Sequence, residues 1–166
     1  MQISSHIYGT TSDGCQVTQY IMESRNGVRI ACLDYGCIIT NLWVNDREGT
    51  PTDIVLGYDD IAAYERDTTS MGAFTGRVAN RIKDSRFTIN GRDYRLQPNN
   101  GVNHPHGVFN KRMYAASISG GSLRFTYRSP DGEDGFPGNL DVTVTYTLDD
   151  NNVFSMQYEA VSDADT

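Results

Sequence analysis

The segment GAFTGRVANRI, residues 72–82, holds three side chains that could bind a polar ligand. Arg77 and Arg81 are four residues apart, which places both on one side of a helix or a strand. Asn80 stands next to Arg81, and an amide beside a guanidinium offers several hydrogen-bond donors to sugar hydroxyls or to a carboxylate. Two glycines in the segment permit a close approach of the backbone. The alternative is a pair of exposed arginines bonded to surface carboxylates, an arrangement that stabilises a protein very little.

Two histidines, His104 and His106, are two residues apart in NNGVNHPHG, residues 99–107. In a strand they would share one face, and an H-x-H pair of this kind resembles half of a cupin metal site. Such a site also needs a nearby glutamate and a later histidine, but the next glutamate is Glu133 and the third histidine, His6, comes earlier. Distant oxygen ligands would be required, so we predict no metal. For either histidine alone, local hydrogen bonding in a loop is the simplest interpretation.

A third stretch, SPDGEDGFPG at residues 129–138, combines three carboxylates with three glycines. Its spacing does not fit the calcium-binding loop D-x-D-x-D-G-x5-E. Pro, Asp and Gly in this order are typical of a long hairpin turn, which is the stronger interpretation. Because ligand-binding residues often lie on loops, the stretch still leaves room for a functional edge.

The composition excludes several classes of partner. The chain has 166 residues and a net charge of −7, from 14 basic and 21 acidic side chains, so it repels a phosphate backbone and we expect no nucleic acid partner. The first residues show neither the basic nor the apolar region of a signal peptide, and no apolar run approaches the roughly 20 residues that span a bilayer. We therefore expect a cytoplasmic protein without a membrane partner.

The cysteines indicate neither a disulfide framework nor a zinc site. There are three of them, Cys15, Cys32 and Cys37, an odd number, and no two form a C-x-x-C pair. We expect buried free thiols in a cytosolic protein.

Short segments with a period of two dominate the sequence and predict β-strands. Apolar and polar side chains alternate in SLRFTYRS (residues 122–129), in LDVTVTYTL (140–148) and in the final stretch, residues 153–161. Each strand is expected to bury one face and to leave the other in water. Asn90 and Gly91, between two such runs, predict a tight hairpin.

The remaining elements complete an all-β prediction. Residues 28–44 are expected to form two strands broken at Tyr35 and Gly36. The only helical candidate is residues 59–67, with Asp59 or Asp60 as its cap. Many short strands at regular spacing indicate an antiparallel β-sandwich or barrel. No linker, low-complexity tract or internal repeat interrupts the chain, so we expect residues 1–166 to form a single domain.

These segments, taken in order, resemble the N-terminal half of the galactose mutarotase, or aldose 1-epimerase, family. The family motifs G-R-x-A-N-R-I, N-x-x-H-G and S-P-D-G-E-x-G-[FY]-P-G match the three stretches described above. YGCIITNLWVNDREGTPTDIVLGYDD, residues 35–60, also resembles the family's opening strands. The resemblance implies an antiparallel β-sandwich of the galactose mutarotase-like type, of which this chain supplies about half.

Members of the family interconvert the α and β anomers of aldoses such as galactose and glucose, without a cofactor. A carboxylate base takes the proton of the C1 hydroxyl while an acid protonates the ring oxygen, so that the ring opens and closes on the other face. By the resemblance, Asn80 and Arg81 match the sugar-contacting pair. His106 matches the first active-site histidine, and it is implied both in catalysis and in substrate binding. Arg77, earlier in the motif, is given a supporting role inside the fold.

The chain also departs from the family pattern. The family's second histidine, the usual general acid, and its C-terminal glutamate base are expected in a segment after Thr166, as is a further sugar-binding aspartate. Pro105 replaces the usual leucine and Val108 the second glycine. We therefore expect this chain to supply one wall of a sugar site and either to self-associate or to pair with the missing C-terminal half.

Two other functions stay open from the sequence. The first is a non-catalytic carbohydrate-binding module with the same fold, and the second is a cupin-like metalloprotein. If the chain were an enzyme by itself, Glu133, Asp131 or Glu159 would have to act as the base, although no motif points to any of them.

Overall fold

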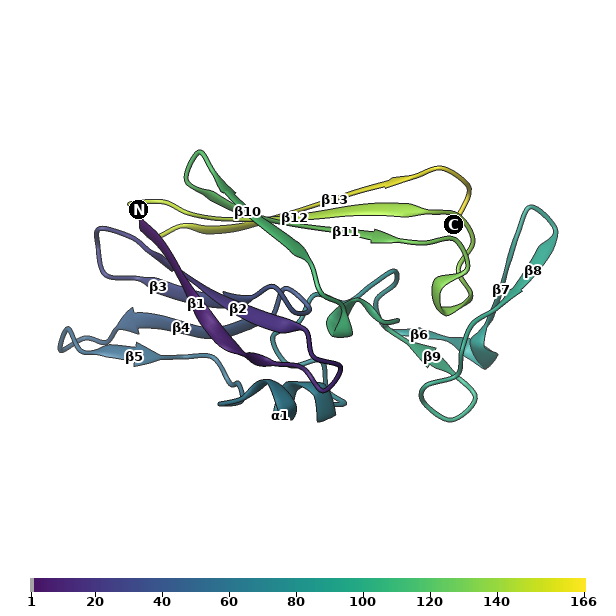
Figure 1. Cartoon of the computed structure of the whole chain (residues 1–166), viewed down its shortest axis with the longest axis horizontal. Coiled ribbons are helices and arrows are strands. Elements are labelled where there is room, and N and C mark those ends of the chain that lie inside the picture. The colour runs from purple at the N-terminus through teal and green to yellow at the C-terminus, as the bar shows by residue number, and fades with distance from the viewer. Residues whose placement is uncertain (1) are drawn as a thin grey trace.

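The computed structural model of the chain describes residues 2–166, which form antiparallel strands with very little helix (Figure 1). One sheet has the strand order β1-β2-β3-β4-β5, and each neighbouring pair is antiparallel. Strands that are consecutive in the chain are neighbours in space, so this sheet is a meander. Its members are β1 (Gln2–Thr10), β2 (Gln16–Glu23), β3 (Arg29–Leu33), β4 (Ile39–Asn45) and β5 (Pro51–Asp53).

The second sheet is an antiparallel meander of four strands in the order β10-β11-β12-β13. In Figure 1 the two sheets lie over one another as two layers. The layered antiparallel arrangement confirms the predicted β-sandwich. The strands of this sheet are β10 (Ala115–Ser119), β11 (Ser122–Ser129), β12 (Leu140–Leu148) and β13 (Phe154–Ser162).

Two short strand pairs lie to one side of the layers, at the right of Figure 1. β6 (Arg81–Ile82) pairs with β9 (His104–Pro105), and β7 (Arg86–Ile89) pairs with β8 (Arg92–Arg95). The predicted hairpin is confirmed, because only Asn90 and Gly91 separate Ile89 from its partner Arg92. Both loop residues have positive φ, 51° and 76°, as the tight primed hairpin turn requires. Single 3-10 turns η1 (Lys83–Ser85), η2 (Phe109–Lys111) and η3 (Glu133–Gly135) occur in the connections.

The helix predicted within residues 59–67 is α1 (Ile61–Arg66). Asp60 caps it, since its carboxylate accepts a hydrogen bond from the Ala63 N–H at 2.7 Å. Ile61 and Tyr64 are buried and anchor the helix to a small apolar cluster on the first sheet. Within residues 2–166, no helix is long and apolar enough to cross a membrane.

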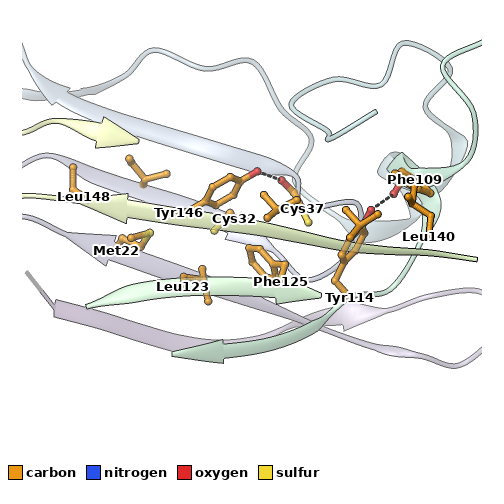
Figure 2. Packing of buried hydrophobic residues seen from close by; sticks show 13 residues of the cluster. Met22, Cys32, Cys37, Phe109, Tyr114, Leu123, Phe125, Leu140, Tyr146 and Leu148 are labelled. Carbon is orange, nitrogen blue, oxygen red and sulfur yellow. Dashed lines mark hydrogen bonds between the residues drawn. The ribbon is translucent and has the colours of Figure 1, made fainter. Parts of the chain in front are cut away.

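The main hydrophobic core lies between the two sheets (Figure 2). β12 shows how the alternating sequence produces it, because Val142, Val144 and Tyr146 are at most 3% exposed while polar side chains occupy the positions between them. Full burial of such a side chain contributes roughly 1.5–3 kcal/mol. The Tyr146 hydroxyl donates to the carbonyl oxygen of Cys37 at 2.9 Å, so this buried polar group is satisfied.

β13 departs from the prediction that every strand buries one face. Phe154 packs against the core, but Met156 and Tyr158 are 47% and 50% exposed, and Val161 is 70% exposed. β13 is the outermost strand of its sheet and pairs only with β12 within residues 2–166. The periodicity therefore predicted the strand correctly, but burial also needs a covering layer, which depends on the neighbours of the strand.

The three cysteines are free thiols, as predicted, but only two of them are buried. Cys32 lies in β3 and Cys37 lies two residues before the start of β4, in the break predicted near Tyr35 and Gly36. Burial raises the pKa of the Cys32 thiol well above its usual value, which makes it unreactive. Cys15 is exposed, so the prediction of a buried thiol is wrong at that position.

Candidate functional site

The short β6–β9 pair brings together the two sequence segments that carry the predicted site residues. Arg81 lies opposite Pro105, and Ile82 lies opposite His104. Asn80 directly precedes β6 and His106 directly follows β9, so they end up beside one another although 26 positions separate them. The pairing thus brings Asn80, Arg81 and His106 close to one another, which makes this place the candidate site.

Asn80 and His106 are joined by two reciprocal hydrogen bonds. The Asn80 N–H donates to His106 Nδ1 at 3.1 Å, and the His106 N–H donates to the Asn80 carbonyl oxygen at 3.0 Å. Both residues have positive φ, 64° and 65°. Because Nδ1 accepts a hydrogen bond, the proton of the neutral ring lies on Nε2, which is left as a donor. The backbone of one site residue thereby determines the tautomer of the other.

The turn into His106 also ends the alternation on which the sequence prediction for the two histidines rested. β9 contains only His104 and Pro105, and the left-handed backbone at His106 redirects its ring. His104 is fully buried and contacts Gln97 and Asp134 instead of Asn80. The two histidines therefore do not share one face of a strand, which is the arrangement that a cupin-like metal site would need. In the described part of the chain, no group of three or more His, Cys, Asp or Glu side chains is placed to hold a metal ion.

The Arg81 guanidinium is exposed and open to a ligand. Within residues 2–166 it makes no hydrogen bond to a protein group and no ion pair, although it can donate five hydrogen bonds. Asn80 is exposed as well, and His106 is half-buried. A guanidinium, a side-chain amide and an imidazole N–H together form a set of donors suited to hydroxyl or carboxylate oxygens.

Arg77 is anchored inside the fold, as the sequence predicted. Its guanidinium donates to the carbonyl oxygens of Ser129, Pro130, Pro137 and Gly138 at 2.9–3.2 Å. It also donates twice to the Ser129 hydroxyl, at 2.8 and 3.0 Å. These acceptors all lie in residues 129–138, which we call the platform loop. Arg77 therefore ties the site segment to this loop.

The three carboxylates considered as a base have partners elsewhere. Glu133 forms an ion pair with Arg112 at 2.7 Å and accepts a hydrogen bond from the Tyr127 hydroxyl at 2.6 Å. Burial raises the pKa of Glu133, but hydrogen bonds, first from the Ser129 hydroxyl and then from Tyr127 and Arg112, outweigh it and leave the pKa below its ordinary value. A carboxylate held in this way is a structural group and a poor base.

Asp131 and Glu159 are no better placed. Asp131 accepts a hydrogen bond from the Gly138 N–H within the platform loop, and Glu159 lies exposed on β13 beside Gln157. In the described residues, neither is hydrogen-bonded to Asn80, Arg81 or His106.

A polar hollow of about 380 Å³ lies beside His106. Lys111 lines it and is held by three backbone carbonyl oxygens, those of Tyr64, Glu65 and Asp67. Asn110 also lines the hollow and donates to the Ser70 hydroxyl at 2.9 Å. Ser70, Asn110 and Lys111 are not among the site residues predicted from the sequence. The only signal was the polar stretch NKR shortly after His106.

A larger hollow of about 570 Å³ lies between the β7–β8 hairpin and the last residues of the chain. Arg92 and Tyr94 line one side, and Asp163 and Asp165 line the other. It contains none of the predicted site residues, so we place the candidate site at the β6–β9 pair.

Comparison with known proteins shows which family has this sequence and this sandwich fold. The sequence profile of the aldose 1-epimerase family matches residues 18–166. Galactose mutarotase of Sus scrofa is 37% identical over 152 residues, which cover 90% of this chain and 44% of that protein. Aldose 1-epimerase of Escherichia coli strain K12 is 33% identical over 155 residues, which cover 91% of this chain and 45% of that protein.

Solved structures agree with the sequence comparison. An aldose epimerase homologue from C. elegans matches with a TM-score of 0.80 at 33% identity, over 87% of this chain and 46% of that one. Galactose 1-epimerase of Lactobacillus acidophilus NCFM shares the fold, with a TM-score of 0.81 at 24% identity over 98% of this chain and 49% of that one. The fold thus defines a sandwich of the galactose mutarotase type. The chain belongs to the aldose 1-epimerase family, a family of isomerase-type enzymes, and spans about half the length of these relatives.

Proposed function

We propose that this chain forms one wall of the sugar site of an aldose 1-epimerase, with Asn80, Arg81 and His106 facing the sugar. The observation that carries the proposal is the reciprocal pair between Asn80 and His106, which leaves the His106 Nε2–H as a donor. The neighbouring strand β6 adds the Arg81 guanidinium, which has no partner among residues 2–166. The site belongs to a chain of the aldose 1-epimerase family, so the substrate class that we propose is an aldose such as galactose or glucose.

The chemistry of the proposal moves only protons. A base removes the proton of the C1 hydroxyl, the bond between C1 and the ring oxygen breaks, and the ring oxygen takes a proton from an acid. Rotation about the C1–C2 bond and closure then deliver the other anomer. The imidazole of His106 can donate or share a proton with the ring oxygen or a hydroxyl of the sugar. General acid–base assistance of this kind contributes about 10²–10⁴-fold per group.

Arg81 and Asn80 have a different role in the proposal, which is to orient the sugar. A guanidinium presents donors in a rigid planar arrangement, so it can hold two neighbouring hydroxyls in one geometry. The base is expected from another polypeptide segment, because Glu133, Asp131 and Glu159 are engaged elsewhere. The exposed edge of β13 supports the idea that a second copy or the C-terminal half of the family fold packs against the chain. A single domain over residues 1–166 and a cytoplasmic location are further proposals that rest on the sequence.

A non-catalytic carbohydrate-binding module is the second candidate. It is favoured because none of the three carboxylates considered as a base is placed to act as one, whereas sugar binding needs only the hydrogen-bond donors of Asn80, Arg81 and His106. The two candidates differ in one measurable property, because only the epimerase accelerates the exchange between the anomers.

The test combines galactose titration with polarimetry of the α-to-β interconversion. We expect the chain to bind galactose and expect Arg81→Ala and His106→Ala each to weaken binding about tenfold or more, since each removes donors to the sugar. Arg47→Ala is the matched control, because the Arg47 side chain is 91% exposed and lies in the turn between β4 and β5. If both site variants bind galactose as the control does, the site assignment is wrong.

Acceleration of the interconversion in proportion to protein concentration supports the epimerase. Binding without acceleration, in a chain whose mass matches all 166 residues, supports the binding module or half of an enzyme. Light scattering at the same concentrations then shows whether activity accompanies self-association.

A further inference from the structure

His104, two residues before His106, is fully buried and has one assigned hydrogen bond. Its Nδ1 lies 2.6 Å from the Gln97 carbonyl oxygen. A carbonyl oxygen can only accept, so Nδ1 carries a proton. His104 is therefore protonated on Nδ1, whereas the neutral ring of His106 is protonated on Nε2.

The second ring nitrogen of His104, Nε2, faces the carboxylate of Asp134, and this contact requires a proton between the two atoms. Nε2 lies 3.2 Å from Asp134 Oδ2, and the two side chains are 0% and 9% exposed. Within residues 2–166, neither atom has any other hydrogen-bond partner. If both atoms carried only lone pairs, they would repel one another and both would be left unsatisfied in a buried place. One proton between them removes both penalties, whether the pair is imidazolium and carboxylate or neutral imidazole and carboxylic acid.

The pair connects the site to the platform loop. His104 belongs to β9, where it lies opposite Ile82 of β6. Asp134 belongs to the platform loop, and its carbonyl oxygen accepts a hydrogen bond from the Gln97 N–H at 3.3 Å. Gln97 thus bonds to both members of the pair, with its carbonyl to the ring and its N–H to the backbone of Asp134.

We propose that His104 and Asp134 are a positioning pair that shares one proton between Nε2 and Oδ2 and thereby holds β9, and with it the ring of His106, against the platform loop. The inference rests on the proposed function only in making His106 the group that is positioned. Together with Arg77, which binds the same loop, the pair fixes both segments of the site to one support.

Three neighbouring groups, besides burial, affect the pKa of Asp134. Burial raises the pKa of the Asp134 carboxyl, His104 and Arg112 lower it, and Glu133 raises it. Glu133 and Arg112 form an ion pair with one another, so their effects largely cancel. On the remaining side the Phe136 ring contacts the imidazole edge-on, with 5.8 Å between ring centroids, and carries no charge.

The sign of the pH dependence follows from the raised pKa of Asp134. A group that binds its proton more tightly in the folded chain stabilises the fold at low pH, and this contribution is lost as the pH rises. Asp134→Asn keeps a donor for Nε2 that does not titrate. The stability of the unmodified chain relative to Asp134→Asn should therefore fall as the pH rises above about 4, the ordinary pKa of an aspartate.

The direct test needs no variant and no sugar. Long-range nitrogen–proton correlation spectra of the imidazole rings distinguish the two tautomers, and only three histidines have to be assigned. We expect His104 to carry a proton on Nδ1 throughout, and neutral His106 to carry its proton on Nε2. A His104 ring with a bare Nδ1 would overturn the proposal.

The positioning role is tested with Asp134→Leu, which has no donor, and Asp134→Asn, which has one. In Asp134→Leu we expect His106 to lose its single tautomer and the Asn80 amide to exchange with solvent about tenfold faster, because β9 is no longer held. Asp134→Asn should keep the single His106 tautomer and the slow exchange of the Asn80 amide. The control Asp141→Asn should keep them as well, because Asp141 is an exposed carboxylate bonded to Arg128.

Two results would contradict the positioning role. One is an unchanged His106 ring in a folded Asp134→Leu chain, and the other is equal loss in the leucine and asparagine variants. If Asp134→Leu does not fold, the Asn variant and the variant-free spectra still decide the proposal. None of these measurements involves sugar, so failure of the proposed sugar site would leave them intact.

Discussion

Two regions of this molecule, built from the same residue types, use their polar side chains in opposite ways. In the platform region, the Arg77 guanidinium donates hydrogen bonds to the Ser129 hydroxyl and to several carbonyl oxygens of the loop at residues 129–138. In the site region, only four residues further along the chain, the Arg81 guanidinium is exposed and makes no hydrogen bond to the described residues. The difference shows that one segment supplies both the support and the open surface of the site.

The reason for the difference is where each side chain finds acceptors. The platform loop turns several carbonyl oxygens toward Arg77, and a guanidinium is the side chain that can satisfy many of them at once. β6 and β9 are each two residues long, and the exposed Arg81 side chain meets no acceptor within residues 2–166. Unused donors on a rigid support are what a binding site for a hydroxyl-rich ligand needs.

Replacing Arg77, which anchors the platform region, should have the largest effect on stability. Arg77→Ala leaves several carbonyl oxygens without their charged donor, and we expect a loss of about 3–5 kcal/mol in the free energy of unfolding. Arg77→Lys should restore little, because an ammonium cannot reach the same acceptors at once. Urea unfolding measures both, with Arg47→Ala as the control. A loss below about 1 kcal/mol for Arg77→Ala would mean that the platform does not depend on the guanidinium.

The next largest effect should come from the close approach beside His106. Gly107 has a φ of 93°, and a Cβ there would lie 2.1 Å from the Gly76 carbonyl oxygen. Gly101 has a φ of 62° with no heavy atom within 4 Å of its Cβ position, so it shares the strain without the clash. We expect Gly107→Ala to cost about 2–3 kcal/mol and Gly101→Ala about 1 kcal/mol. Urea midpoints give the difference, and equal values would show that the backbone contact is unimportant.

Arg81→Ala tests the same difference between the two regions in the site region, where we expect binding to change and stability to stay the same. Because its guanidinium is exposed and unpaired in the described chain, we expect the free energy of unfolding to change by less than about 0.5 kcal/mol. The same variant should weaken galactose binding, so stability and binding separate at this residue and not at Arg77. A large loss of stability on Arg81→Ala would place it with the platform.

A further effect, confined to acid pH, should come from Asp67, which lines the hollow beside His106. Burial raises the pKa of Asp67, but hydrogen bonds from Thr69, Met71 and Tyr58 outweigh it and lower the pKa to about 2. A carboxylate with a lowered folded pKa stabilises the fold above its unfolded pKa of about 3.9, and this contribution is lost as the pH falls toward about 2.

The measurement for Asp67 is thermal unfolding between about pH 5 and about pH 2, compared with Asp67→Asn. The gap in stability between the two proteins should narrow as the pH falls. A gap that is constant over this range would show that the hydrogen bonds do not depend on the charge of Asp67.

Much of the fold could be predicted from the sequence because its signals act between near neighbours. The alternation in residues 140–148 became β12, the Asn90-Gly91 pair became a hairpin, and Asp60 became a helix cap. Each of these depends on the geometry of a few adjacent residues. The order of the three motifs likewise carried the resemblance to the family, which the comparisons confirmed.

Only the tertiary structure decided which partners each side chain meets. Arg77 and Arg81 have the same chemistry, yet Arg77 binds Pro137, 60 positions away, while Arg81 is open. His104 and His106 were indistinguishable as a pair, yet opposite nitrogens of their rings carry the proton. β13 has the pattern of a half-buried strand but is exposed on the described chain. Periodicity determines which way a side chain points, but a hydrogen-bond partner or a covering layer comes from distant segments, which the fold alone brings together.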